Sequence, residues 1–375
     1  MKRRFVNLVT QNWTEGVYSV RRIDPYHHFF YGSADAALRA AAAEKTEPFP
    51  AMRIKELPTP CMNFTAAGSH GGTLDMFALY SPRATGDGRI VYTDMMGNAG
   101  LYDAGRHVHT ALSRLNERKG PQPMCLSIAH PDADEEDNLY VLDTYPGDRG
   151  CFEVLERTRR RFRCRMMPQW HWRLLPPPPF VRQPLYRPSS VTSFTTMVDG
   201  DGCSTIYISC AGAGGVDVGT YSYETPRHEY SEPRGWRHVG EWMLPFRGRA
   251  HYVPEFNLWF GFSASSPDDH LCAADLSAMD GGRQPSAPTV WEDLNPPDEG
   301  EAWLPKQLEL LHLGGGKFLI AKTFTEGERG GYFSVLTGVE MMACAAGDDR
   351  QQTLQMVKHK CARFVFTDEH IERVL

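Results

Sequence analysis

The chain has 375 residues, 41% hydrophobic and 23% charged, the composition of an ordinary folded protein rather than a disordered or fibrous one. Its 40 basic and 46 acidic residues leave a net charge of −6, too small by itself to indicate a nucleic-acid or membrane partner. No apolar run approaches the roughly 18 residues of a membrane span, and nine cysteines without a CxxC pair argue against a disulfide framework. We therefore expect a cytoplasmic or nuclear protein without a signal peptide or transmembrane segment.

The N-terminal region predicts three strands and a helix. Residues 4–9 and 16–22 alternate apolar and polar side chains, as half-buried strands do. Residues 27–31, with the sequence His-His-Phe-Phe-Tyr, are expected to add a further strand. The alanine-rich stretch 34–44 is the best helix candidate and lies in an insertion, residues 35–60, between the first two repeats.

A two-strand pattern then repeats five times along the chain. Each copy has a short hydrophobic strand and, 12 to 15 residues later, a second one. The copies begin at residues 89, 138, 205, 257 and 317. Repetition at intervals of 49 to 67 residues predicts the four-stranded blades of a β-propeller, with one strand before and one strand after each copy.

The flanking strands complete the blades. The preceding strands are expected at residues 74–80, 123–129, 191–198, 249–255 and 308–313, and the following ones, often with tryptophan, at 170–172, 236–243 and 289–293. The N-terminal strands form a sixth copy that lacks its first strand. Residues 362–366 are expected to supply it, while residues 354–360 complete the preceding copy.

The predicted fold is therefore an all-β, six-bladed β-propeller, closed by N- and C-terminal strands that share one blade. This arrangement would remove open sheet edges, which otherwise invite aggregation. We expect residues 1–375 to form this single domain, with a proline-rich linker at residues 175–190 between two blades.

Several phrases of the sequence resemble a known family. They lie at residues 170–180, 219–225, 244–255, 258–263 and 356–360. Over nearly its whole length the chain resembles a large plant family, expanded in grasses, known as domain of unknown function 1668. The resemblance implies a kelch-like or F-box-associated-like propeller without an assigned reaction, and it provides no catalytic residues.

The loops between the second and third strands of the blades are the predicted binding surface. Variable loops on a rigid scaffold commonly carry function, and a propeller gathers these loops on one rim. The aromatic and charged residues on them that suit a binding hot spot are Trp13, Tyr145, Arg149, Asp217, His270 and Arg329. The alternative for each residue is a solvent-exposed position without a role.

A basic run stands out in the second of these five copies, the one that begins at residue 138. Its six arginines, within nine residues, are Arg157, Arg159, Arg160, Arg161, Arg163 and Arg165. They could contact phosphates, an acidic partner or the nuclear import machinery. Phe162 is the only aromatic residue among them, which gives little support to stacking on nucleic-acid bases. We interpret the run as an exposed connection between two strands, with a partner-binding patch as the alternative.

No motif predicts a cofactor or a metal site. The glycine-rich residues 212–219 lead into an expected strand, whereas a phosphate-binding loop opens a helix. The acidic run 132–138 has Asp137 where an EF-hand loop needs glycine. We interpret the paired histidines, at positions 27–28 and at positions 107 and 109, as ordinary strand residues.

The complete repeat and the absence of a recognisable catalytic set predict a non-enzymatic scaffold that binds an unidentified protein partner. The alternative is a propeller enzyme or a carbohydrate-binding protein with a site in the central channel. Nucleic acid and membranes are not the expected partners, and the oligomeric state does not follow from the sequence.

Overall fold

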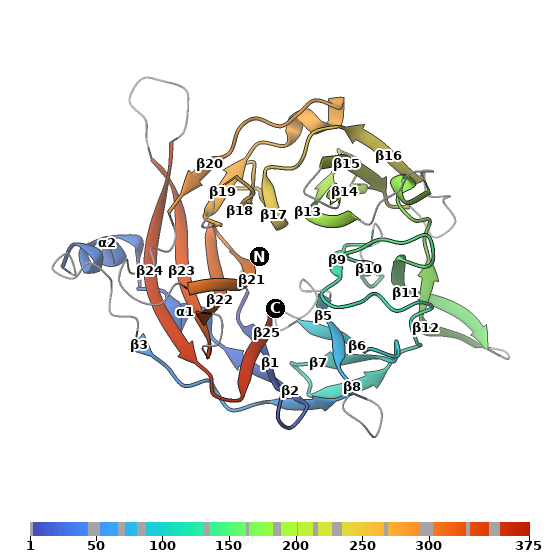
Figure 1. Ribbon diagram of the computed structural model, residues 1–375, viewed down its shortest axis with the longest axis horizontal. Helices are drawn as coiled ribbons and strands as arrows, with labels where there is room; N and C mark the ends of the chain where they lie inside the picture. Colours follow the sequence, from blue (N-terminus) through green and yellow to red (C-terminus); the bar gives the residue numbers. More distant parts are fainter. Residues whose placement is uncertain are drawn as a thin grey trace. The chain divides into compact units, whose positions relative to one another are not determined.

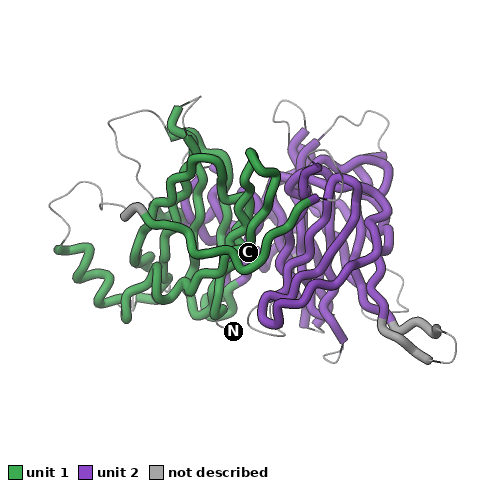
Figure 2. The backbone as a smooth tube through the Cα atoms, turned by 90° about the horizontal axis from the view of Figure 1, so that it is seen from below, with its two compact units in different colours: residues 1–65, 253–257, 290–375 green, residues 66–252, 258–289 purple. Residues whose placement is uncertain are grey.

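A computed structural model shows that the chain is mostly antiparallel β-structure (Figure 1). It divides into two compact units, coloured green and purple in Figure 2. Unit 1 comprises residues 1–65, 253–257 and 290–375, and unit 2 comprises residues 66–252 and 258–289. The structure describes residues 3–43, 53–66, 72–80, 88–130, 135–162, 165–182, 189–200, 202–212, 217–226, 235–265, 269–292, 303–327, 331–344 and 353–375, with the backbone alone for 53–54, 159–162, 165–168 and 280.

In unit 1 the N-terminal strand pairs with the C-terminal strand. The sheet has the order β25-β1-β2-β4. β1 and β2 form a hairpin in which Val6 pairs with Ile23, and Leu8 of β1 pairs with Val374 of β25 (Figure 1). The bounds of the strands are β1 (Val6–Asn12), β2 (Val17–Ile23), β4 (Met62–Thr65) and β25 (Glu369–Val374).

The expected pairing of residues 362–366 with the N-terminal strand is wrong. These residues continue β24 (Thr353–Val365), where Phe364 pairs with Ser334 of β23 (Tyr332–Cys344). Because β23 is 13 residues long, one ladder satisfies the backbone of the whole segment, and the next strand is left to pair with β1. The prediction that a C-terminal strand completes the N-terminal sheet is confirmed, with β25 in that role.

The expected strand at residues 27–31 is also wrong. The short helix α1 (Pro25–Phe29) forms there because the Asp24 carboxylate accepts hydrogen bonds from the N–H groups of Tyr26 (3.0 Å) and His27 (3.2 Å). Pro25 suits the first helical position, where no N–H partner is needed. β4 supplies the fourth strand instead. The helix predicted at residues 34–44 is confirmed as α2 (Ala34–Ala43).

The second sheet of unit 1 has the order β21-β22-β23-β24-β3. Its remaining strands are β21 (Trp303–Gly314), β22 (Lys317–Glu326) and the two-residue β3 (Arg53–Ile54), which is parallel to β24. The two sheets and α1 share one hydrophobic core. Its fully buried members include Val6, Leu8, Phe29, Leu319 and Leu336.

Unit 2 begins with two four-stranded antiparallel sheets, ordered β5-β6-β7-β8 and β12-β11-β10-β9. Side chains from both sheets, among them Met76, Val91, Leu139, Val141 and Trp172, form one hydrophobic cluster. The strands are β5 (Leu74–Tyr80), β6 (Arg89–Asp94), β7 (Ala99–Asp103), β8 (Val108–Ala111), β9 (Met124–Ile128), β10 (Asn138–Leu142), β11 (Phe152–Phe162) and β12 (Arg165–Leu174).

Two further groups of four strands follow, β13 to β16 and β17 to β20, and they belong to unit 2 except for the last residue of β17 and the last two residues of β20. A short parallel pairing, Ser193 with Gly248 and Phe194 with Arg249, joins them into one eight-stranded sheet. The elements are η1 (Pro179–Arg182), β13 (Ser189–Val198), β14 (Ser204–Gly212), β15 (Asp217–Glu224), β16 (Gly235–Gly240), β17 (Phe246–Val253), β18 (Leu258–Ser263), β19 (Leu271–Ala274), η2 (Ser277–Gly281) and β20 (Thr289–Trp291).

The interpretation of the basic run as a connection between two strands is wrong for most of the run. Residues 157–162 continue β11, and Arg165 begins β12. Both strands are longer than predicted because they extend as a two-stranded ribbon past the end of β10. The other second and third strands of the repeats form where they were expected, and across the described ranges the sheets contain six four-stranded groups.

Candidate functional site

Among the described residues, a side chain at the end of the second strand or directly after it caps the following turn in four of the strand groups, and these side chains are Asn12, Asp94, Asp143 and Ser263. Asp94 ends β6 in unit 2, and one of its carboxylate oxygens accepts hydrogen bonds from the N–H groups of Met96 and Asn98, both at 2.9 Å. The other oxygen accepts the Asn98 amide at 2.8 Å. Gly97 has a φ of 82°, which suits glycine, so the sequence Asp-Met-Met-Gly-Asn forms a rigid turn that carries two methionines at its tip.

The next repeat of unit 2 builds the same kind of turn. Asp143 follows β10, and its carboxylate accepts the N–H of Tyr145 at 3.0 Å. Burial raises the pKa of Asp143, and the hydrogen bond from Tyr145 partly offsets this effect. Tyr145 lies at the tip of the turn with 65% of its surface exposed.

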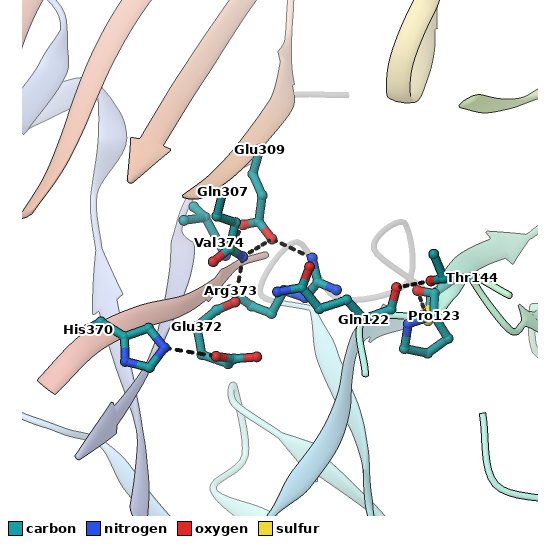
Figure 3. Close-up of polar contacts among 10 residues, drawn as sticks. Gln122, Pro123, Thr144, Gln307, Glu309, His370, Glu372, Arg373 and Val374 are labelled. Atoms are coloured by element: carbon teal, nitrogen blue, oxygen red, sulfur yellow. Dashed lines mark hydrogen bonds and ion pairs between the residues drawn. The ribbon is translucent and has the colours of Figure 1, made fainter. Parts of the chain in front are cut away.

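Residues 112–123, which connect β8 to β9, lie between these two turns. At one end the N–H of Leu115 donates to the carbonyl of Gly97 at 2.9 Å. At the other end the Thr144 hydroxyl donates to the carbonyl of Gln122 at 2.7 Å (Figure 3). The two turns and the connection therefore form one continuous edge of unit 2.

A buried carboxylate holds the connection in place. Glu153 of β11 accepts hydrogen bonds from the N–H groups of Asn116 (3.1 Å) and Glu117 (3.0 Å) and from the Asn116 side chain (2.7 Å). Lys119 forms an ion pair with the same carboxylate. Each oxygen therefore has two donors, which compensates the cost of burying the charge and fixes the path of the connection.

The side chains displayed on this edge are large and exposed. Met95, Met96 and Tyr145 have 39%, 53% and 65% of their surface exposed. Arg114 and Arg149 are exposed and form no ion pair with a described residue, whereas Arg118 pairs with Asp75 at 2.7 Å and is half exposed. We call this set, namely Met95, Met96, Arg114, Arg118, Tyr145 and Arg149, the loop face of unit 2.

In unit 1 the corresponding turn begins with Asn12, whose side-chain oxygen accepts the N–H groups of Thr14 (3.0 Å) and Glu15 (2.9 Å). Trp13 at its tip is 42% exposed. Its ring also stacks on His370 (5.4 Å between centroids) and contacts Tyr332 (5.5 Å). Trp13 is therefore partly a packing residue, which the sequence did not indicate.

Figure 3 shows the polar contacts that hold β25 in unit 1. The Glu309 carboxylate of β21 accepts Arg373 Nη1 at 2.9 Å and the side-chain amide of Gln307 at 3.1 Å. His370 Nε2 lies 3.0 Å from Glu372 Oε2. The Arg373–Glu309 ion pair holds the last strand to β21, and backbone pairing holds it to β1.

The other predicted hot-spot residues are not part of the loop face of unit 2. Asp217 is exposed at the start of β15, and His270 is half buried, with its carbonyl accepting the N–H of Ser263 at 2.8 Å. Arg329 lies outside the described residues. The structure thus joins Tyr145 and Arg149 in one surface but connects neither of them to Asp217.

Of the basic run, only Arg157 has a described side chain. Its guanidinium lies over the Trp170 ring at 5.6 Å and binds Glu136 at 3.2 Å. Arg159, Arg160, Arg161 and Arg165 are described by their backbone alone, and Arg163 lies outside the described residues.

Met95, Met96, Arg114 and Arg118 were missed by the sequence analysis. The methionines look like core residues by type, and only their place directly after a capping aspartate signals exposure. The two arginines lie in a connection whose path depends on Glu153, 35 residues after Arg118. No local pattern could reveal that contact.

The described side chains provide little for metal or thiolate chemistry. Among them, no group of three or more histidine, cysteine, aspartate or glutamate residues could hold a metal ion. Burial raises the pKa of Cys151 to about 11 and that of Cys272 to about 12, so both thiols stay protonated at neutral pH. No described helix is long and apolar enough to cross a membrane.

Comparison with known families gives one match. The model of the family described as Protein of unknown function (DUF1668) matches residues 3–364. The chain belongs to this family. The match extends from before β1 to the end of β24, so the DUF1668 region contains almost every strand described above. No curated protein matches the chain.

Proposed function

We propose that this DUF1668 protein is a non-enzymatic scaffold that binds a protein partner through the loop face of unit 2. The observation that carries the proposal is the display of Met96 and Tyr145, which are 53% and 65% exposed, on turns that their own capping aspartates hold rigid. A turn whose backbone is already fixed loses little conformational entropy when a partner covers it.

The residue types on this surface support a protein partner. Tyrosine, arginine and methionine are enriched in protein interfaces, and tyrosine and arginine are frequent hot spots. Methionine adapts its shape to varied apolar surfaces. The loop face of unit 2 exposes Met95, Met96 and Tyr145 on the same edge as Arg114 and Arg149, so it fits a partner with apolar side chains and carboxylates.

We also propose that the six four-stranded groups are the blades of a closed, kelch-like β-propeller. Support comes from the pairing of β25 with β1, which joins the two ends of the chain in one sheet, and from the repeated use of four short antiparallel strands. Such a scaffold would keep the turns rigid while their sequences vary.

Site-specific photo-crosslinking tests the binding surface. A photoreactive phenylalanine analogue replaces Met96 or Tyr145 in the full chain, and Val198, which is 66% exposed at the end of β13, is the matched control. We expect the same partner to be captured from positions 96 and 145 but not from position 198. Capture from position 198 alone, or equally from all three positions, contradicts the proposal.

A quantitative pull-down adds an energetic test. The double variant Met96→Lys, Tyr145→Ala should retain that partner about tenfold less well, because two hot-spot residues together contribute well over 1.4 kcal/mol. The Val198→Lys variant should retain it as the wild-type chain does.

A further inference from the structure

The ribbon formed by β11 and β12 is a second charged feature of unit 2, at the opposite end of its sheet from the loop face. β11 pairs with β10 only through residues 152–155, whereas residues 156–162 pair with β12 alone (Figure 1). At about 3.3 Å per residue, this part of the ribbon is about 23 Å long. Between Arg157 and Trp170 the sequence contains six arginines and no acidic residue.

The charge of the ribbon opposes that of the rest of the chain. Setting these six arginines aside leaves 34 basic and 46 acidic residues, a net charge of −12 instead of −6. Such a concentration of positive charge on an otherwise acidic protein favours an anionic ligand small enough to contact the ribbon alone.

The first rung of the ribbon, where the side chains are described, shows how an anion is held. Arg157 pairs in register with Trp170, lies over its ring, and binds the Glu136 carboxylate at 3.2 Å. Arg89 binds the same carboxylate, also at 3.2 Å through Nη1. This rung therefore combines an arginine, an apolar partner across the ribbon and a carboxylate.

The next rungs repeat two of these three components. Arg159 pairs with Pro168 and Arg161 pairs with Met166, and alternation along the strand places both arginines on the register face of Arg157. From Arg157 to Trp170 the ribbon has no acidic residue to supply the carboxylate. Glu156 at its base is already bound to Arg173 by two hydrogen bonds, at 2.8 and 3.0 Å.

We propose that this ribbon binds an extended, acidic segment of a partner protein whose carboxylates alternate with small or apolar residues. Alternate residues of an extended peptide lie about 6.8 Å apart, the same spacing as alternate arginines along β11. A nucleic acid fits less well, since Phe162 is the only aromatic residue of the run and the net charge of −12 elsewhere repels a long polyanion.

Fluorescence anisotropy with the full chain tests the proposal. The probe is a short labelled peptide in which glutamate alternates with valine and serine, and the competitor probes are a peptide of the same composition with its glutamates in one block and a short DNA duplex. We expect the alternating peptide to bind most tightly and to be released by salt. Tighter binding of the duplex would assign the ribbon to nucleic acid and overturn the proposal.

Variants locate the binding on the ribbon. Arg159→Gln with Arg161→Gln should weaken peptide binding about tenfold, the loss expected for two ion pairs. The matched control, Arg106→Gln with Arg283→Gln, removes two exposed arginines elsewhere in unit 2 and should change binding little. Thermal unfolding of both variants checks that they fold.

Two further outcomes would also overturn the proposal. Asp132 and Asp134 precede Glu136 in the sequence. If Asp132→Asn with Asp134→Asn creates peptide binding that the wild-type chain lacks, the chain's own acidic segment occupies the ribbon. If sedimentation shows salt-sensitive self-association that the ribbon variant abolishes, the occupant is a second copy of the chain. Absence of photo-crosslinks at positions 96 and 145 would contradict the proposed role of the loop face and would leave the ribbon proposal unaffected.

Discussion

Lys119 and Glu153 form an ion pair in which 1% and 0% of the two side chains are exposed. The pair joins the connection between β8 and β9 to β11, and it fixes the surface on which Arg114 and Arg118 lie. A buried pair of this kind contributes mainly by defining one path for the chain, because burying both charges offsets most of their attraction.

Removing one partner of this ion pair should lower the stability of the folded chain considerably. In the Lys119→Met variant the Glu153 carboxylate stays buried without its cation, so we expect the free energy of unfolding to fall by about 3–5 kcal/mol. Urea denaturation followed by tryptophan fluorescence measures the loss. The control is Arg118→Met, whose half-exposed pair with Asp75 should be worth less than about 1 kcal/mol. Equal losses in both variants would contradict this account.

His312 of β21 should make unit 1 sensitive to acid. Burial lowers its pKa to about 4, with Arg3 adding to the shift and Glu255 opposing it, and its Nε2 has no hydrogen-bond partner among the described atoms. The unfolded chain, with a histidine pKa near 6.5, binds this proton more readily than the folded chain. The free energy of unfolding is therefore unaffected by His312 above about pH 6.5. It falls by up to about 3 kcal/mol as the pH decreases towards 4, because the unfolded chain takes up the proton first.

The His312→Gln variant tests this dependence. It should show a smaller loss of stability than the wild-type chain when urea midpoints are compared between pH 7 and pH 4.5. His27, which is exposed on α1, gives the control variant His27→Gln, and this change should leave the pH dependence unaltered. An unchanged profile in His312→Gln would show that other groups cause the acid sensitivity.

Gly338 of β23 allows α1 to approach the sheet. A Cβ atom there would collide with the backbone carbonyl of Phe29, which cannot move without shifting the helix. We expect Gly338→Ala to lower stability by about 1–3 kcal/mol, the usual cost of overpacking. Gly147, which has no atom within 4 Å of the same position, provides the control: Gly147→Ala should change the melting temperature little.

Ile371 tests the role of the last strand. It is 1% exposed and packs in the core that both sheets of unit 1 share. Ile371→Ala should cost about 2–5 kcal/mol, whereas Val365→Ala, at a position that is 53% exposed, should cost well under 1 kcal/mol. Hydrogen exchange at the amides of β1 should rise in the Ile371 variant. Unchanged exchange there would mean that β1 does not depend on β25.

Much of the candidate site could be predicted from local sequence. The positions of Arg114 and Arg118 could not, because they depend on a contact with a distant residue. Tyr145 and Arg149 could be identified because they lie in a loop between two predicted hydrophobic strands. The exposure of Met96 depends on the cap that Asp94 provides, which is a local signal that residue type alone hides. Arg114 and Arg118 join the surface only through Glu153, a contact made across the sheet.

Most strands of the repeats were determined by the sequence, because the pattern of apolar side chains and turn residues acts over a few neighbouring positions, whereas β4 and β25 were not predicted. The cap of α1 is equally local, since Asp24 and Pro25 precede the helix directly. Tertiary structure alone decided which strands pair. Residues 362–366 and 369–374 are both short segments with buried apolar residues, and the choice of β25 as the partner of β1 depends on the ladder between the 13-residue strands β23 and β24. Pairing over such distances is set by the competition of whole ladders for backbone hydrogen bonds, which no single segment encodes.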